Sequence, residues 1–284
     1  MKPLKIMLLI FLSLLLTSTF SLTVNADVGP KPFVNMEIIG MGDQTYTATL
    51  ISKEASGPNF FYEDYLEFGD PWMDYHPIME YEDSEGYRWI GQHWELSGDD
   101  EFSWSYYPPD NFKLIIMTDN DIIFTTGVLE RYAFGSYFQA DVSSAVDGVI
   151  SNLKIIEAVT PNYDFLKEIA AFMFRLLLTL AIEVGIALLF GFRKKKELYA
   201  IFFVNIITLV FLNAMLNITT YYHGEFLAVA FYIIGELIVF IVESVFYVFY
   251  FYEHRLKAFL YGLIANISSF AAGFFLYLLE RAIT

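Results

Sequence analysis

The sequence predicts a signal peptide, an all-β, sandwich-like extracellular domain and a four-span α-helical transmembrane bundle. Three observations support this fold class. The chain opens with cationic and apolar residues, continues as short strand-like runs separated by turn residues, and ends in four apolar stretches. Each stretch can cross the hydrocarbon core of a bilayer as a helix, because about 20 residues suffice. The expected boundaries are residues 1–26, 27–160 and 165–284.

The N-terminal segment has the features of a secretory signal. Lys2 and Lys5 precede an apolar run, and Val24 and Ala26 occupy the −3 and −1 positions of a cleavage site. The alternative is an uncleaved anchor helix. Both interpretations put the domain that follows outside the cytoplasm.

The next domain alternates apolar runs with turn residues. We expect strands at Phe33–Ile39, Tyr46–Ile51, Tyr87–His93, Phe102–Tyr106, Phe112–Met117, Asp121–Thr126, Ser136–Val142 and Ile150–Ile156. The polar connection after Met117 is short, which favours a hairpin. Several short strands at this spacing predict an antiparallel sandwich around one core, with no long helix before the membrane.

The predicted extracellular domain is acidic, and the chain contains no cysteine. Residues 27–168 carry 26 Asp and Glu but seven Lys and Arg, within a net charge of −16 for the whole chain. Such a surface repels polyanions and attracts cations or basic surfaces, so we expect no nucleic-acid partner. Without cysteine the domain has no disulfides, and thiol catalysis is excluded.

The four apolar stretches predict helices at about residues 169–192, 198–216, 227–251 and 259–279. Lys and Arg cluster in two of the three connections, at Arg193–Lys196 and at Arg255 and Lys257, whereas Asn217–Phe226 contains neither. Cations concentrate on the cytoplasmic side of short connections. We therefore expect a multi-pass protein of the cell membrane, with residues 27–160 and the C-terminus extracellular.

Polar side chains lie inside every predicted span, where an ionisable group costs about 2.5–3.5 kcal/mol on insertion scales. The candidate cluster consists of Arg175, Glu183, Asn205, Thr208, Glu236, Glu243 and Asn266. Helical spacing puts Arg175 and Glu183 on one face, and Glu236 and Glu243 on another. Arg175 is expected to reach Glu236. At least one of the other two glutamates is then expected to be protonated, or to share a cation with its neighbour.

Two interpretations of this cluster stay open. In one, the carboxyl and amide groups form a site for a proton or a metal cation in a transport or coupling path. In the other, they are hydrogen-bonding groups that hold the bundle or a partner helix together, at ~0.6–2 kcal/mol each. An intramembrane enzyme has little support, since the spans contain no Asp-Asp, His-Glu-x-x-His or Ser/His pair.

The tryptophans are concentrated in one part of the predicted extracellular domain, with acidic residues between them. The candidate ligand surface consists of Trp72, Trp89, Trp94 and Trp104. Aromatic faces beside acidic groups suit sugars, choline-like cations or peptides. The alternative is a core that uses large side chains where disulfides are absent. His76, His93 and the acidic turns at 99–101 and 119–121 are weak metal candidates.

Several segments carry a resemblance to other proteins. They are Asp27–Pro32, Tyr107–Pro109, Leu129–Tyr132, Leu180–Glu183, Phe190–Lys195, Asn205–Thr208 and Ala265–Ser269. In these the chain resembles a group of uncharacterised membrane proteins from Gram-positive bacteria, with a signal peptide, a β-rich extracellular domain and four C-terminal transmembrane helices. The resemblance implies this architecture and a bacterial surface setting.

The expected role is non-enzymatic: an accessory, sensing or scaffold component whose extracellular domain binds a ligand or partner. The alternative is an ion- or proton-coupled transporter component that uses the intramembrane carboxylates. Expected partners are membrane lipid and either other membrane proteins or a second copy of the chain, and no cofactor is expected. The cytoplasmic connections are too short to hold a domain that phosphorylates or hydrolyses nucleotides.

Overall fold

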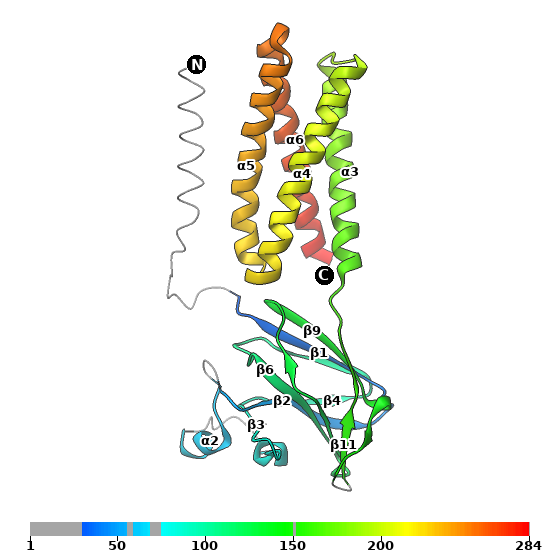
Figure 1. Cartoon of the computed structure of the whole chain (residues 1–284), viewed down its shortest axis with the longest axis vertical. Coiled ribbons are helices and arrows are strands. Elements are labelled where there is room, and N and C mark those ends of the chain that lie inside the picture. Colours follow the sequence, from blue (N-terminus) through cyan, green and yellow to red (C-terminus); the bar gives the residue numbers. More distant parts are fainter. Residues whose placement is uncertain (1–29, 56–58, 69–74, 150–151, 284) are drawn as a thin grey trace. The chain divides into compact units, whose positions relative to one another are not determined.

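The computed structural model describes residues 30–55, 59–68, 75–149 and 152–283, with side chains as far as residue 275. A β-rich region of two mixed sheets precedes four long apolar helices (Figure 1). The predicted signal peptide lies outside the described residues.

The first sheet is centred on β1 (Phe33–Ile39) and β9 (Gly135–Asp141), which run parallel to each other. β5 (Asp100–Trp104) pairs antiparallel with β1, and β12 (Ala158–Pro161) pairs antiparallel with β9. The predicted strand at Phe33–Ile39 is confirmed at both ends. The expectation of purely antiparallel pairing is wrong, since β1 and β9 are parallel. Apolar residues alternate with the same period in parallel and antiparallel strands, so this pattern does not reveal strand direction.

The second sheet is centred on β6 (Asn111–Thr118), which pairs antiparallel with β2 (Thr45–Ser52) and β7 (Ile123–Thr126). Its other strands are β3 (Arg88–Trp89), β4 (Trp94–Ser97), β8 (Leu129–Glu130), β10 (Val146–Asp147) and β11 (Leu153–Ile156). β11 runs parallel to β7, a second correction to the antiparallel expectation. The predicted β6–β7 hairpin is confirmed. Asp121 in its turn has a φ of 59°, which Asp adopts more readily than most residues.

Several expected strands differ in length from the observed ones, and short helices lie between others. β7 begins two residues later than the predicted strand Asp121–Thr126. The segment Tyr87–His93 contributes only the two residues of β3, since Gly91 turns the chain with a φ of 106°. A short helix, α2 (Tyr62–Phe68), and two 3-10 turns, η1 (Pro77–Glu80) and η2 (Val142–Ser144), complete the region.

The main core of the β-rich region is shared by its two sheets. Val34, Met36 and Ile38 of β1 are fully buried and cluster with Leu114 and Ile116 of β6. Burial of each such side chain stabilises the fold by about 1.5–3 kcal/mol. Buried and half-buried residues alternate along β1, so one face of this strand points into the core, whereas β6 is buried on both faces.

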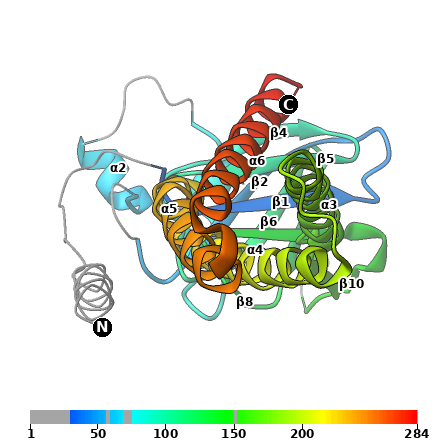
Figure 2. The ribbon, with the colours of Figure 1, turned by 90° about the horizontal axis from the view of Figure 1, so that it is seen from above.

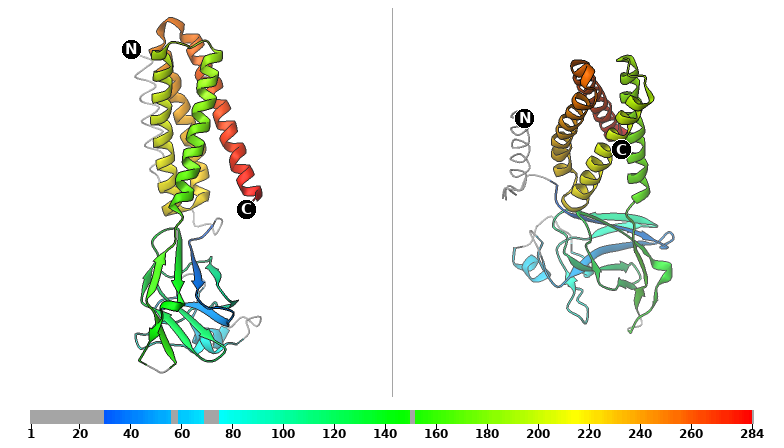
Figure 3. Two further views of the ribbon diagram at one scale, coloured as in Figure 1. Left: turned by 90° about the vertical axis from the view of Figure 1, so that its right-hand side faces the viewer. Right: turned by 45° about the horizontal axis from the view of Figure 1, so that its top comes forward.

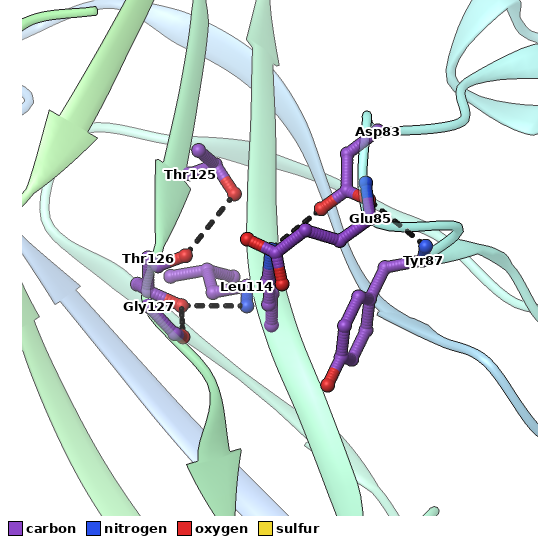
Figure 4. A network of polar contacts seen from close by, with 8 residues as sticks. Asp83, Glu85, Tyr87, Leu114, Thr125, Thr126 and Gly127 are labelled. Atoms are coloured by element: carbon purple, nitrogen blue, oxygen red, sulfur yellow. Dashed lines mark hydrogen bonds and ion pairs between the residues drawn. The ribbon is translucent and has the colours of Figure 1, made fainter.

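The opposite face of β6 carries a buried ion pair. The Nζ of Lys113 lies 2.6 Å from Asp83 Oδ2 and 3.3 Å from Glu85 Oε1, and Figure 4 shows both acidic side chains beside β6. Burial opposes the charge on Asp83. Hydrogen bonds from Lys113 and from the backbone amides of Tyr87 and Glu85 nevertheless lower the pKa of Asp83 below its usual value.

Four helices among the described residues are long and apolar enough to cross a membrane. They are α3 (Phe165–Leu189), α4 (Lys195–His223), α5 (Glu225–Tyr250) and α6 (Arg255–Ile283). α3 and α5 each pack against both α4 and α6, so the helices surround a common axis (Figure 2). Figure 3 shows them running side by side. They fit a multi-pass membrane protein.

α4 is longer than predicted, and the expected connection Asn217–Phe226 is reduced to Gly224. With a φ of 81°, Gly224 ends α4 and precedes α5 directly. Glycine adopts this conformation without steric cost. The polar, β-branched residues before it have low helix propensity. Thr219 is nevertheless accommodated in the helix, and its hydroxyl donates to the carbonyl of Met215 at 2.8 Å.

Large apolar side chains cover the outside of the helices. Phe174, Leu177, Phe203, Ile207 and Phe211 are all more than half exposed. Soluble proteins rarely expose contiguous apolar patches of this kind, whereas lipid solvates them. The exposed apolar surface therefore agrees with a membrane setting.

Candidate functional site in the helix bundle

Two glutamates from different helices are buried near the centre of the bundle. Glu183 of α3 is 2% exposed, and Glu243 of α5 is fully buried. Asn205 of α4 and Asn266 of α6 lie with them and are also buried. The structure thus brings the deepest members of the predicted cluster together, one from each helix.

Glu243 is hydrogen-bonded to two neighbouring helices. Its Oε1 accepts from the hydroxyl of Thr208 on α4, and its Oε2 accepts from Nδ2 of Asn266 on α6 at 3.0 Å. Both carboxyl oxygens are therefore paired. The Glu243 side chain connects α4, α5 and α6.

Glu183 is only half paired. Its Oε1 accepts from the hydroxyl of Ser269 on α6 at 3.3 Å. Its Oε2 is buried and has no hydrogen-bond partner among the residues that the structure describes. A buried polar atom without a partner is destabilising and requires an explanation. The site is therefore incomplete at this oxygen.

Asn205 contributes a second unpaired atom next to Glu183. Its Nδ2 donates to the carbonyl of Ile201 and to the hydroxyl of Tyr247, both at 2.9 Å. The carbonyl of Ile201 can only accept, so this contact determines which end of the amide carries the oxygen. That oxygen, Oδ1, is buried and unpaired within the described part of the chain. The side chains of Asn205 and Glu183 are neighbours.

A cavity of about 40 Å³ reaches Glu183 and Glu243. Arg175 and Glu236 also line it, in the half of the bundle where α3 begins. Arg175 and Glu183 are eight residues apart, or ~12 Å along the helix axis. A cavity of this volume can hold one or a few water molecules. Glu183 is therefore within reach of water from that half of the bundle.

Aromatic side chains fill the bundle on the other side of the glutamates. Phe192, Tyr247, Phe251 and Tyr261 form a buried cluster, with the rings of Tyr247 and Tyr261 5.1 Å apart. This packing closes the bundle at the end where α3 and α5 terminate. The two tyrosines are absent from the predicted site residues. Tyr247 follows Glu243 by four residues, a spacing that places both on one helix face.

The expected ion pair between Arg175 and Glu236 is not formed. Both residues line the cavity, but no ion pair of Arg175 occurs among the described residues. Arg175 is exposed on α3, and a side chain of this length can extend towards the membrane interface, where its charge is hydrated.

Two of the four tryptophans of the expected ligand surface lie in the core. Trp89 and Trp104 are fully buried, and Trp94 stacks on Phe102 with ring centroids 4.5 Å apart. Trp72 lies outside the described residues. Large rings that fill a core without disulfides explain the burial, and a buried face cannot contact a ligand.

His76 and His93 lie together, with ring centroids 5.7 Å apart. Nδ1 of His76 accepts from the amide of Ile78 at 3.1 Å, and its Nε2 is hydrogen-bonded to Thr47. Both ring nitrogens of His76 are therefore engaged. No group of three or more His, Cys, Asp or Glu residues suited to a metal occurs in the described ranges. Burial lowers the pKa of both histidines.

Comparison of the chain with family models, with curated proteins and with solved structures gives no match. The site must therefore be interpreted from its own chemistry. An acidic group with an unpaired, buried oxygen whose side chain lines a cavity large enough for water can take up a proton or a small cation.

Proposed function

We propose that this chain is an ion- or proton-coupled component of the cell membrane that binds a proton or a small cation at Glu183. The supporting observation is the Oε2 atom of Glu183, which is buried and unpaired among the described residues and belongs to a side chain that lines the cavity. A carboxylate that only holds helices together has both oxygens paired, as Glu243 does.

In this proposal the sandwich-like β-rich region lies outside the cell, as the distribution of Lys and Arg supports. α3 follows directly after this region, so the half of the bundle that contains Arg175 faces outward. The cavity is then reached from the extracellular side. A bacterial surface setting, implied by the resemblance, is part of the same proposal.

The test is ion flux through the full-length protein in proteoliposomes. We expect the wild-type protein to dissipate an imposed pH or Na⁺ gradient. Glu183→Gln is expected to reduce the flux to that of protein-free liposomes. The control Glu253→Gln, at an exposed residue outside this cavity, is expected to keep most of the flux. Wild-type flux no greater than that of Glu183→Gln contradicts the proposal.

A second candidate is the non-enzymatic accessory or scaffold role, for which Glu243 is the supporting observation. Its hydrogen bonds to α4 and α6 are those of a residue that maintains a bundle. The exposed apolar faces of the helices also offer room for partner helices. Impermeable wild-type proteoliposomes, combined with specific cross-links to another membrane protein, would favour this role.

A further inference from the structure

We propose that Glu183 binds one proton on Oε2 and that the protonated carboxyl group donates a hydrogen bond to Oδ1 of Asn205. This inference rests on the proposed function and narrows its ligand from a proton or small cation to a proton. It also assigns Asn205 as the residue that positions the proton.

Two buried acceptor oxygens in the bundle cannot pair with each other. Oε2 of an ionised Glu183 and Oδ1 of Asn205 are both acceptors, both are buried, and neither has a partner among the described residues. A proton on Oε2 converts one of them into a donor. A single hydrogen bond between the neighbouring side chains then satisfies both atoms.

The surrounding hydrogen bonds restrict the other arrangements. Nδ2 of Asn205 is occupied by Ile201 and Tyr247, so the amide cannot be turned to donate to Glu183 without leaving the carbonyl of Ile201 unpaired. The hydroxyl of Tyr261 donates to the backbone carbonyl of Glu183 at 3.4 Å, and not to its carboxyl group. Among these side chains, the donor that remains is Glu183 itself once it is protonated. A cavity water that bridges the two oxygens is the alternative, and it predicts an ionised Glu183 without a carboxyl band.

A metal cation fits these atoms less well. Hard cations such as Ca²⁺ take about six or more oxygen ligands. Oε1 of Glu183 accepts from Ser269, and Glu243 already accepts from Thr208 and Asn266. Three buried oxygens of the helices, those of Glu183, Asn205 and Ser244, lack a partner among the described residues. They are too few to replace the hydration shell of a cation, whereas one proton is enough to join Glu183 to Asn205.

The cavity supplies a route for this proton. Water in the cavity can transfer a proton to the carboxylate of Glu183 and is replenished from the half of the bundle that contains Arg175. The cluster that contains Tyr247 and Phe192 closes the opposite side. In this conformation the proton exchanges with the solution on one side of the membrane, and the flux expected above requires the aromatic cluster to open towards the other side.

Infrared spectroscopy of the full-length protein in lipid nanodiscs tests this assignment, because a protonated carboxyl group has a C=O stretch separate from the carboxylate bands. We expect such a band at neutral pH in the wild type and its loss in Glu183→Gln. The band persists in the matched variant Glu243→Gln. In Asn205→Ala it shifts to higher frequency, since the acceptor is lost, and in D₂O it shifts as the proton exchanges.

Gln at position 183 can donate to Asn205, so Glu183→Gln is expected to fold, which its melting temperature verifies. A carboxyl band that is unchanged in Glu183→Gln overturns the inference. So does a band that Na⁺ abolishes when it replaces choline, because the site then holds a cation. If the protein carries flux but shows no carboxyl band, the inference is refuted and the proposed function stands. If the band is present without flux, Glu183 is protonated as inferred and the proposed function is refuted.

Discussion

Glu183 and Glu243 are both buried glutamates inside their spans, but their partners differ. Glu243 accepts hydrogen bonds from two other helices, whereas one oxygen of Glu183 is unpaired among the described residues. The first arrangement stabilises a bundle, and the second is open to a ligand. The two interpretations of the polar cluster thus apply to different residues within it.

This difference predicts opposite effects of the same substitution. In Glu243→Gln the amide NH₂ can donate to the Thr208 hydroxyl, which then donates to the carbonyl of Val204, and the amide oxygen can accept from Asn266. A neutral amide is a weaker acceptor than a carboxylate, so the variant is expected to destabilise the bundle by about 1 kcal/mol. Thermal unfolding in detergent, followed by circular dichroism, measures the effect. Glu183→Gln is the matched control, with an unchanged or raised melting temperature. Equal melting of Glu243→Gln and the wild type would show that Glu243 is not structural.

At the scale of elements, η1 depends on a neutral histidine. Nδ1 of His76 caps it by accepting from Ile78, and Ile78 and Met79 are buried. Protonation of His76 removes this acceptor. Burial lowers the pKa of His76 in the fold, although the nearby carboxylates of Glu95 and Asp119 partly oppose the shift.

The β-rich region is therefore expected to lose stability as the pH falls. The contribution of His76 is complete above its unfolded-state pKa of about 6.5 and is lost as the pH falls from that value towards the lower folded pKa. Tryptophan fluorescence of the full-length protein during denaturation reports this, since every tryptophan lies before residue 105. His76→Asn keeps a capping oxygen and is expected to flatten the pH dependence, with His93 responsible for the remainder. If stability depends on pH in His76→Asn as it does in the wild type, His76 is not the source of the pH dependence.

The close approach of α5 and α6 depends on Gly262. A Cβ atom at this position would lie 3.1 Å from Oγ of Ser244 and 3.3 Å from Cδ2 of Tyr247. Gly262→Val is expected to separate the helices and destabilise the bundle by about 1–3 kcal/mol. Gly185→Val on α3 is the control, because a Cβ there meets nothing within 4 Å. The comparison is made by melting temperature, and similar values for the two variants would contradict the packing argument.

At the scale of the whole molecule, the even number of candidate spans predicts that the β-rich region and the C-terminus lie on the same side of the membrane. We expect protease added to intact protoplasts to cleave within residues 31–160, and a reporter fused after Thr284 to be active outside the cell. A reporter active in the cytosol, or a β-rich region protected from protease, would reverse the orientation and with it the side from which the cavity opens.

Much of the architecture was predictable from local patterns. The four helices follow from apolar stretches whose length is set by the bilayer, and β1 and the β6–β7 hairpin follow from alternation and turn residues. The direction of β9 against β1 was not predictable, since parallel and antiparallel strands share one period. The length of α4 was also missed, because the residues before Gly224 have low helix propensity on their own.

The sequence by itself determined which positions inside the spans are polar and which helix face each occupies, because helical spacing is a local property. Only the tertiary structure decided that Glu243 is paired and that one oxygen of Glu183 is not. It also revealed the roles of Tyr247 and Tyr261. The physical reason is that hydrogen bonds between helices depend on how each helix is rotated and shifted against its neighbours, which packing of the whole bundle decides.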